Sequence, residues 1–297
     1  MLHNMGSDHP ESPARIGAIL NQLQDSRILQ HLDMYRAEPV SEEALLRVHP
    51  ATYIEQLKVM TPKQGRVYAD PDTAIMTHTL PAAYLSAGAA VQATDLVLSG
   101  QHQSVFCATR PPGHHAERNK TMGFCFFNNV AIAVRHAMQH HGLKRVAIVD
   151  FDVHQGNGTV DIFQDDPAVL LCSSFQHPFY PHSHYFIQKP NIINSPLEAG
   201  TSGLEFRQRV ERDWLKPLQQ HKPEMIFISA GFDGHALDPM GELQLVEADY
   251  RWVTEMVMSV AREYAQGRVV SVLEGGYHLQ ALAKSVEAHL EAMAGLR

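Results

Sequence analysis

The sequence has few cysteines, and they do not form a recognisable pattern. Its 297 residues include only Cys107, Cys125 and Cys172, with no Cys-x-x-Cys spacing. An odd, widely spaced set argues against a disulfide framework, so we expect a reducing compartment. No apolar run approaches the roughly 18 residues that a membrane span needs, and residues 1–6 lack the features of a signal peptide. These absences predict a soluble cytoplasmic protein with no membrane partner.

Positive charge is also scarce. The chain has 24 Lys and Arg against 32 Asp and Glu, which gives a formal net charge of −8. Because proteins bind nucleic-acid phosphates with Lys and Arg, this composition argues against direct nucleic-acid binding. An acidic surface mildly favours cationic substrates such as amines.

Short apolar segments alternate with amphipathic helical segments over the last two thirds of the chain. Each is apolar on both faces, which is typical of central parallel strands covered by helices on both sides. The predicted strands are Ser104–Ala108, Arg145–Val149, Val169–Cys172, Met225–Ser229 and Arg268–Leu273. The predicted helices between them are Asn128–His141, Gly203–Gln219 and Glu247–Gln266. This alternation predicts an α/β fold with one doubly wound, mostly parallel sheet and helices on both faces.

One long segment lacks this alternation. Residues 177–201 carry four prolines, at positions 178, 181, 190 and 196. We expect an extended loop here, of the length that usually serves a function or is mobile.

Titratable residues follow four of the predicted strands, at the sheet edge where parallel α/β proteins bind ligands. The four segments are Arg110–His115, Asp150–His154, Ala230–Asp233 and Glu274–Tyr277. Glycines within or beside them permit close approach of a ligand. A functional site explains four such segments together better than chance does.

A metal site is expected where two of these strands end. Asp150, Asp152 and His154 are spaced two residues apart, so their side chains face the same side of an extended chain. Asp152 and His154 can hold one ion, and Asp233 completes the three-ligand set that leaves a catalytic zinc one open position. The oxygen-rich set also leaves ferrous iron or cobalt open. The alternative is that Asp150 and Asp152 only cap the following turn.

The adjacent histidines His114 and His115 follow a Pro-Pro-Gly turn and are expected to face the same cleft. An imidazole has the intrinsic pKa of a general base near pH 7. We expect Asp150 to orient one of the rings and Asn157 the other. A His-His pair alone would more simply be a chance feature of a loop.

Tyr277 follows two glycines, Gly275 and Gly276, which allow the backbone to turn tightly beside the site. Its phenol can donate a hydrogen bond to the oxyanion that develops when water attacks an amide carbonyl. Phe124 and Tyr180 are candidates for the apolar walls of a narrow slot. Ordinary core packing is the alternative for all three aromatic residues.

Several motifs together resemble the histone deacetylase superfamily, with its arginase/deacetylase fold. The motifs are Arg110–Ala116, Met122–Ala131, Val149–Thr159, Ser229–Asp233 and Leu273–Tyr277, joined by the early segments His9–Arg15 and His49–Ile54. They are most similar to the class II-like branch, which includes bacterial histone-deacetylase-like amidohydrolases and acetylpolyamine amidohydrolases. The resemblance runs through nearly the whole chain in order, and implies a single deacetylase-type catalytic domain over residues 1–297.

The resemblance implies a role for each site residue. One Zn²⁺ would be bound by Asp152, His154 and Asp233. His115 would be the general base, and His114, paired with Asp150, would assist it electrostatically. Asn157, which stands where some branches carry Asp, would support His115. Tyr277 would polarise the acyl carbonyl.

The resemblance also implies a substrate channel and a second ion. The channel would be lined by Gly123, Phe124, Tyr180, Gly275 and Gly276. A structural K⁺ near the zinc would be held by Asp150, Asp152, His154, Ser173 and Ser174.

The implied activity is zinc-dependent hydrolysis of linear amides, with removal of acetyl or similar acyl groups from acetyl-lysine or acetylpolyamines. One alternative is a ureohydrolase of the same fold, which binds two manganese ions; the Asp-x-Asp-x-His and Gly-Gly-Tyr motifs disfavour it. The other is a non-catalytic binding protein, which the intact His115 and Tyr277 disfavour. Whether the chain forms a homo-oligomer stays open.

The chain departs from the family pattern in two places. It starts close to the first motif, so part of the family's usual first strand is expected to be short or missing. Residues 177–201 also show little of the glycine-rich loop sequence that is typical of the family. Because that loop shapes the pocket mouth, the sequence does not identify the substrate.

Overall fold

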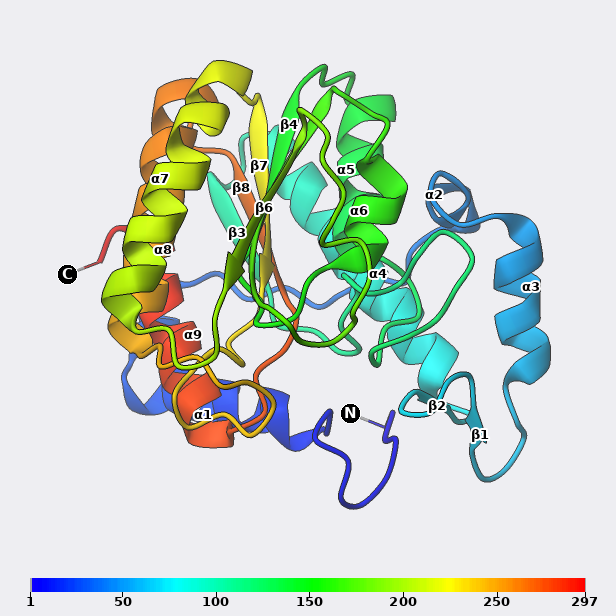
Figure 1. Cartoon of the computed structure of the whole chain (residues 1–297). Coiled ribbons are helices and arrows are strands. Elements are labelled where there is room, and N and C mark those ends of the chain that lie inside the picture. The colour runs from blue at the N-terminus through cyan, green and yellow to red at the C-terminus, as the bar shows by residue number, and fades with distance from the viewer. Residues whose placement is uncertain (1, 297) are drawn as a thin grey trace.

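A six-stranded parallel sheet forms the centre of the computed structural model, which describes residues 2–296 (Figure 1). The strand order is β3-β8-β7-β4-β5-β6, and every neighbouring pair is parallel. The strands are β3 (Ser104–Cys107), β4 (Val146–Asp150), β5 (Val169–Gln176), β6 (Ile192–Leu197), β7 (Met225–Ala230) and β8 (Val269–Leu273). All five strands predicted from the sequence are present, with ends that differ by up to four residues.

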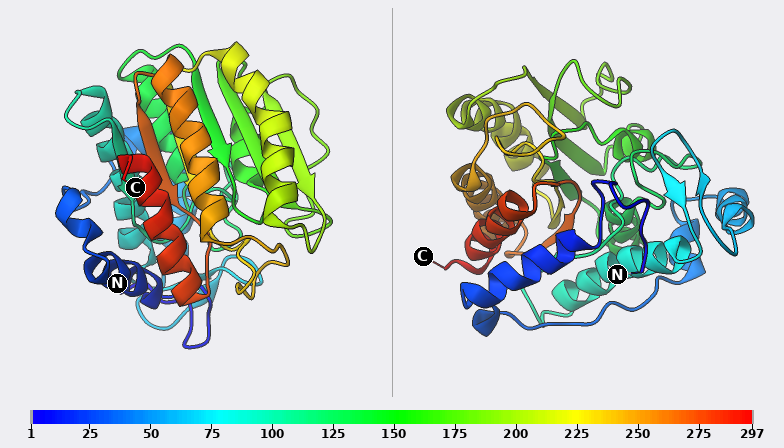
Figure 2. Two further views of the ribbon diagram at one scale, coloured as in Figure 1. Left: turned by 90° about the vertical axis from the view of Figure 1, so that its left-hand side faces the viewer. Right: turned by 90° about the horizontal axis from the view of Figure 1, so that it is seen from below.

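Helices cover both faces of the sheet (Figures 1 and 2). One face is covered by α1 (Ala14–Asp25), α7 (Gly203–His221), α8 (Glu247–Tyr264) and α9 (Leu279–Ala294). The other face is covered by α4 (Thr79–Leu98), α5 (Asn129–Gln139) and α6 (Asn157–Phe163). The predicted α/β fold class is therefore confirmed.

Alternating side chains of the central strands supply the two cores. In β4, Val146 and Ile148 belong to the core under α4, α5 and α6, whereas Ala147 and Val149 belong to the core under α7, α8 and α9. All five residues of β4 are buried. Strands apolar on both faces, as predicted, are stable only because each face has a helical layer to pack against.

Two helices begin at a serine whose side chain caps the first helical turn. Helix α7 begins where the Ser202 hydroxyl accepts from the Glu205 amide and the Glu205 carboxylate accepts from the Ser202 amide. This capping box satisfies backbone donors that the first helical turn leaves free. Helix α2 (Glu42–Leu46) begins in a similar way, with the Ser41 hydroxyl accepting from the Ala44 amide.

The remaining elements follow α1 and precede α4 along the chain. They are the 3₁₀ helix η1 (Ile28–His31), helices α2 and α3 (Ala51–Met60), and the antiparallel pair β1 (Val67–Tyr68) and β2 (Ala74–Ile75). In residues 2–296, no strand precedes β1, and β3 is one edge of the large sheet. None of the helices in this range is both long and apolar enough to cross a membrane.

The prediction of an extended loop over residues 177–201 was wrong in its second half. Residues 192–197 form β6, the edge strand beside β5, with Pro196 opposite Phe175. Proline is tolerated there because an edge strand can leave one side without a backbone donor. The sequence of β6 mixes polar and apolar residues, so it was not recognised as a strand. Only one side of this edge strand pairs with another strand.

Candidate active site

The four predicted site segments come together because their strands are neighbours. Strands β3, β8, β7 and β4 lie side by side in that order, and the strands are parallel, so their carboxyl ends share one edge. The loops after these strands carry His114 and His115, then Tyr277, then Asp233, and finally Asp152 and His154. Residues such as Gly113 and Glu274, which are 161 positions apart in the chain, therefore meet in one site.

Asp152, His154 and Asp233 form a compact buried cluster. Each offers one possible metal-ligating atom, and these atoms lie within 4.8 Å of one another. His154 Nδ1 is 3.1 Å from Asp152 Oδ1 and 3.1 Å from Asp233 Oδ2. The second oxygens are held by backbone amides, since Gly275 N donates to Asp152 Oδ2 and Val153 N donates to Asp233 Oδ1.

The glycine at position 275 is required by this crowding. A Cβ atom there would overlap the carboxylates of Asp233 and Asp152. Only glycine lets the β8 loop run close enough for its amide to bind Asp152.

His114 and His115 lie beside this cluster with their rings 4.0 Å apart. His114 Nδ1 is 3.0 Å from Asp150 Oδ2, and its Nε2 is 3.8 Å from Asp152 Oδ1. His115 Nδ1 is 2.8 Å from Asn157 Oδ1. The Asn157 amide donates through Nδ2 to Glu117, so its oxygen faces the ring, and His115 carries its proton on Nδ1.

The surroundings shift the pKa values of the two histidines in opposite directions. Burial disfavours a charged His114, but the carboxylates of Asp152 and Asp150 outweigh it and raise its pKa well above the usual value. Burial, together with the neighbouring His114 and His154, holds the pKa of His115 well below the usual value. His115 is therefore neutral near pH 7, with its Nε2 lone pair free to accept a proton.

Tyr277 lies on a loop fixed by buried charges. Arg15, which is fully buried, donates 2.6 Å to Gly276 O and 2.5 Å to Glu274 O. The Tyr277 amide donates 2.6 Å to Asp238. The Glu274 carboxylate accepts from the amides of Gly113 and His114, so it ties the Tyr277 loop to the histidine loop.

A cavity of about 290 Å³ leads to this cluster. Its lining residues are Asp72, His115, Gly123, Phe124, His154, Phe179, Tyr180, Pro239, Met240 and Tyr277. Tyr180 stands edge-on to His115, with ring centroids 5.2 Å apart, and Phe124 stands edge-on to Tyr277 at 6.0 Å. Gly123 and Phe124 both have positive φ, which turns the Phe124 ring toward the cavity. Of the predicted channel residues, Gly123, Phe124 and Tyr180 line this cavity, whereas Gly275 and Gly276 are not among its lining residues.

Sequence reasoning missed several residues of the site. Asp72, Phe179, Pro239 and Met240 line the cavity, and Glu117, Arg15 and Asp238 position its catalytic candidates. Glu274 was expected at a strand end, but without its role of joining two loops. Asp70-Pro71-Asp72 has the same Asp-x-Asp spacing as Asp150 and Asp152, so the pattern offered a signal for Asp72.

Ser173 and Ser174 lie on β5, beside the end of β4. Ser173 pairs in register with Asp150, and both serines are buried. The Ser173 hydroxyl has no hydrogen-bond partner within the described part of the chain.

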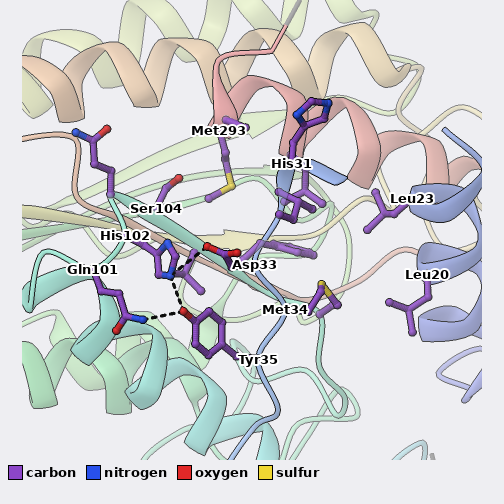
Figure 3. Close-up of a pocket in the computed structure, with 17 residues that line it drawn as sticks. Leu20, Leu23, His31, Asp33, Met34, Tyr35, Gln101, His102, Ser104 and Met293 are labelled. Carbon is purple, nitrogen blue, oxygen red and sulfur yellow. Dashed lines mark hydrogen bonds and ion pairs between the residues drawn. The ribbon is translucent and has the colours of Figure 1, made fainter. Parts of the chain in front are cut away.

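A larger cavity of about 430 Å³ lies elsewhere, against the edge strand β3 (Figure 3). Its walls include Leu23 of α1 and Met293 of α9, and three of its polar residues, Tyr35, Gln101 and His102, are joined by hydrogen bonds. It contains none of the strand-end carboxylates and histidines, so the smaller cavity is the candidate active site.

The sequence also matches the family profile described as histone deacetylase domain, over residues 9–293. The chain belongs to the histone deacetylase family. The histone deacetylase-like amidohydrolase of Pseudomonas aeruginosa is 36% identical over 296 residues, which are 97% of this chain and 78% of that protein. The polyamine deacetylase HDAC10 of Homo sapiens is 35% identical over 314 residues, which cover 96% of this chain and 44% of HDAC10.

A solved structure of the family supports the same assignment. The crystal structure of the HDA15 HD domain superimposes with a TM-score of 0.92 at 29% identity, covering 99% of this chain and 86% of that one. The expected resemblance and the arginase/deacetylase fold are confirmed. This chain is a histone deacetylase-family hydrolase, and the family is generally metal-dependent.

Proposed function

We propose that residues 1–297 act as one catalytic domain, a zinc-dependent amidohydrolase that removes acetyl or similar acyl groups from amines. The observation that carries the proposal is the meeting of Asp152, His154 and Asp233 beside the neutral His115, in a cavity also lined by Tyr277. The names of the related amidohydrolase and polyamine deacetylase support the same reaction class.

The residues present fit a bound dication. Asp152 and Asp233 are buried, and in the described part of the chain only histidines form ion pairs with them. Burial and the nearby Asp152 raise the pKa of Asp233 to about 7, which shows how poorly the site tolerates two uncompensated carboxylates. Zinc held by Asp152, His154 and Asp233 would polarise both the attacking water and the acyl carbonyl.

His115 is suited to accept a proton from the attacking water. Its Nδ1 proton is engaged by Asn157, so the proton is accepted at Nε2. The Asp152 and Asp150 carboxylates raise the pKa of His114 well above its usual value against the effect of burial, so His114 contributes positive charge to the site. The histidine pair then returns a proton to the departing amine, which yields a carboxylate and a free amine.

The Tyr277 phenol would donate a hydrogen bond to the oxyanion that develops on the acyl oxygen. This donor acts only if its loop is held in place before reaction, because preorganised donors cost no rearrangement in the transition state. The hydrogen bonds from Arg15 to the Gly276 and Glu274 carbonyls supply that rigidity.

The cavity favours a linear acylated amine such as acetyl-lysine or an acetylpolyamine. Phe124, Phe179 and Tyr180 give it apolar walls, and the half-buried Asp72 offers a carboxylate acceptor for an amine N–H. The narrow apolar walls suit an alkyl chain, and the acidic net charge of −8 favours a cationic one.

A structural K⁺ would fit beside the zinc cluster. Within residues 2–296 the Ser173 hydroxyl is buried without a partner and lies in register with Asp150, so it is an orphaned oxygen that a cation would satisfy. Asp150, Asp152, His154 and Ser174 would complete this second site.

The three cysteines are free and buried, which supports a reducing compartment such as the cytoplasm.

The test is hydrolysis of a small substrate panel by zinc-loaded and chelator-treated protein. The panel contains an acetyl-lysine peptide, N-acetylputrescine and N-acetylspermidine, and the readout is the amine released. We expect turnover that the chelator abolishes and added Zn²⁺ restores. Zinc-loaded protein that hydrolyses none of the three would contradict the proposal.

A further inference from the structure

Three histidines and one aspartate gather at the end of the molecule opposite the active site. His136 and His140 are at the C-terminal end of α5, and His141 follows directly. Asp95 is near the C-terminal end of α4, the helix that packs beside α5. Both helices lead into strands whose amino ends lie at this edge, so the group is separated from the catalytic cluster by the length of the sheet.

The spacing of the histidines brings their rings onto one surface. His136 and His140 are four residues apart, which places them on one face of a helix. Their rings are stacked with centroids 4.8 Å apart, and the His141 ring is 5.2 Å from His136 and 4.9 Å from His140. Gly142 follows with φ of 77°. This left-handed residue turns the chain, and His141 lies against the helix end.

Asp95 joins the histidines through a single oxygen. Its Oδ1 is 2.7 Å from His136 Nε2 and 2.6 Å from His141 Nε2. One carboxylate oxygen thus faces two imidazole nitrogens, whose N–H protons are the ones that a metal ion would replace.

The possible ligand nitrogens of the three histidines lie within 4.8 Å of one another. Two ligands of a tetrahedral zinc are about 3.3 Å apart, so small side-chain rotations would bring these nitrogens to coordination distance. His140 and His141 are exposed, whereas His136 is buried. Three imidazoles and one carboxylate suit a borderline first-row dication such as Zn²⁺, Ni²⁺ or Cu²⁺.

One neighbour opposes metal binding. Arg47 Nη1 donates 2.7 Å to His136 Nδ1, and an arginine can only donate. A neutral imidazole that binds metal through Nε2 must carry its proton on Nδ1, so Arg47 would have to withdraw. It has a second partner, since its Nη2 donates 2.8 Å to Glu43.

We propose that Asp95, His136, His140 and His141 form a second metal site, which binds a first-row dication and joins the ends of α4 and α5. The site is independent of the proposed hydrolysis, because none of its residues lines the catalytic cavity. Arg47 weakens it by competing for His136 Nδ1.

The experiment counts metal on the holoenzyme with its catalytic metal in place. Wild type and the His140→Ala/His141→Ala variant are dialysed to equilibrium against Zn²⁺, and bound zinc per chain is measured. We expect one equivalent fewer in the variant, with unchanged amide hydrolysis. Zinc should also raise the Tm of wild type by about 5 °C at a hundredfold excess over Kd, and this increment should be lost in the variant.

Two further variants sharpen the test. His31→Ala/His78→Ala removes two exposed histidines outside the group and should keep the wild-type zinc count. Arg47→Met removes the competing donor and should tighten zinc binding at this site by about tenfold. Equal zinc counts in wild type and the His140→Ala/His141→Ala variant would overturn the site, and unchanged or weaker binding by Arg47→Met would overturn the ligand set.

Discussion

The guanidinium carbon of Arg15 lies 4.9 Å from the centroid of the Tyr277 ring, and its nitrogens bind the two backbone carbonyls that flank Gly275. Arg15 is fully buried and pairs with Glu11, which it shares with Arg110. The first helix therefore holds the loop that carries the proposed oxyanion donor, across 261 residues of sequence.

We expect Arg15→Lys to lower kcat by roughly tenfold or more with little change in KM. Lysine keeps the positive charge but loses the planar fork that bonds two carbonyls at once, so the Tyr277 loop becomes less well placed. The check is a double-mutant cycle with Tyr277→Phe. If Arg15 acts through Tyr277, the double variant will be little slower than Tyr277→Phe alone, whereas multiplied losses would show that the two act separately.

Tyr277→Phe should reduce kcat by about a hundredfold or more, because it removes one preorganised donor to the oxyanion. Its fold should be retained, since the contacts described for this loop are made by backbone groups, the Gly276 carbonyl with Arg15 and the Tyr277 amide with Asp238. Steady-state kinetics on the preferred acetylated amine will measure the effect. Near-normal turnover by a folded Tyr277→Phe variant would remove the phenol from the mechanism.

The sequence alone predicted most of the sheet, but neither its strand order nor the edge strand β6. Buried strands such as β4 are apolar on both faces and are visible in any sequence. β6 mixes buried and exposed residues, with Pro196 exposed between the buried Ser195 and Leu197, and it becomes recognisable only once β5 lies beside it. Strand order depends on packing between distant segments, which no local pattern encodes.

The strand-end residues of the site were predictable for a related reason. Polar residues directly after an apolar strand lie where the carboxyl ends of the parallel strands meet, so Asp152, His154 and Asp233 could be placed together in advance. Arg15 and Glu117 could not, because their roles depend on contacts with Gly276 and Asn157 that arise only in the folded chain.

Asp72→Asn should raise KM for a cationic substrate such as N-acetylspermidine by about tenfold and change kcat little, since a charged acceptor at the cavity wall becomes neutral. Burial and the nearby Asp70 raise the pKa of Asp72 to about 6. The carboxylate is therefore charged above this pH, and in wild type KM should fall as the pH rises through about 6. The same pH dependence of KM in Asp72→Asn would exclude this role.

His289 should make the fold sensitive to acid. It is buried between Thr254 and Ser271, and burial lowers its pKa from 6.5 to about 3. The unfolded chain binds this proton more readily, so the stabilisation is complete above pH 6.5 and is lost as the pH falls toward 3. At pH 5 the loss amounts to about 2 kcal/mol.

Urea unfolding of wild type and His289→Gln at pH 7.5 and pH 5 will measure this contribution. The free energy of unfolding should fall by about 2 kcal/mol more in wild type than in the variant over this interval. Equal pH dependence in the two proteins would show that His289 is not the buried neutral group described here.

The most direct test of the account is the zinc content and turnover of Asp233→Ala, measured on one preparation. His140→Ala/His141→Ala serves as the background, so that only the catalytic cluster is counted. We predict that Asp233→Ala loses bound zinc and amide hydrolysis together, whereas Tyr277→Phe in the same background keeps one zinc per chain and loses only turnover. An Asp233→Ala protein that retains its zinc and hydrolyses acetylated amines at the background rate would contradict the proposed metal centre.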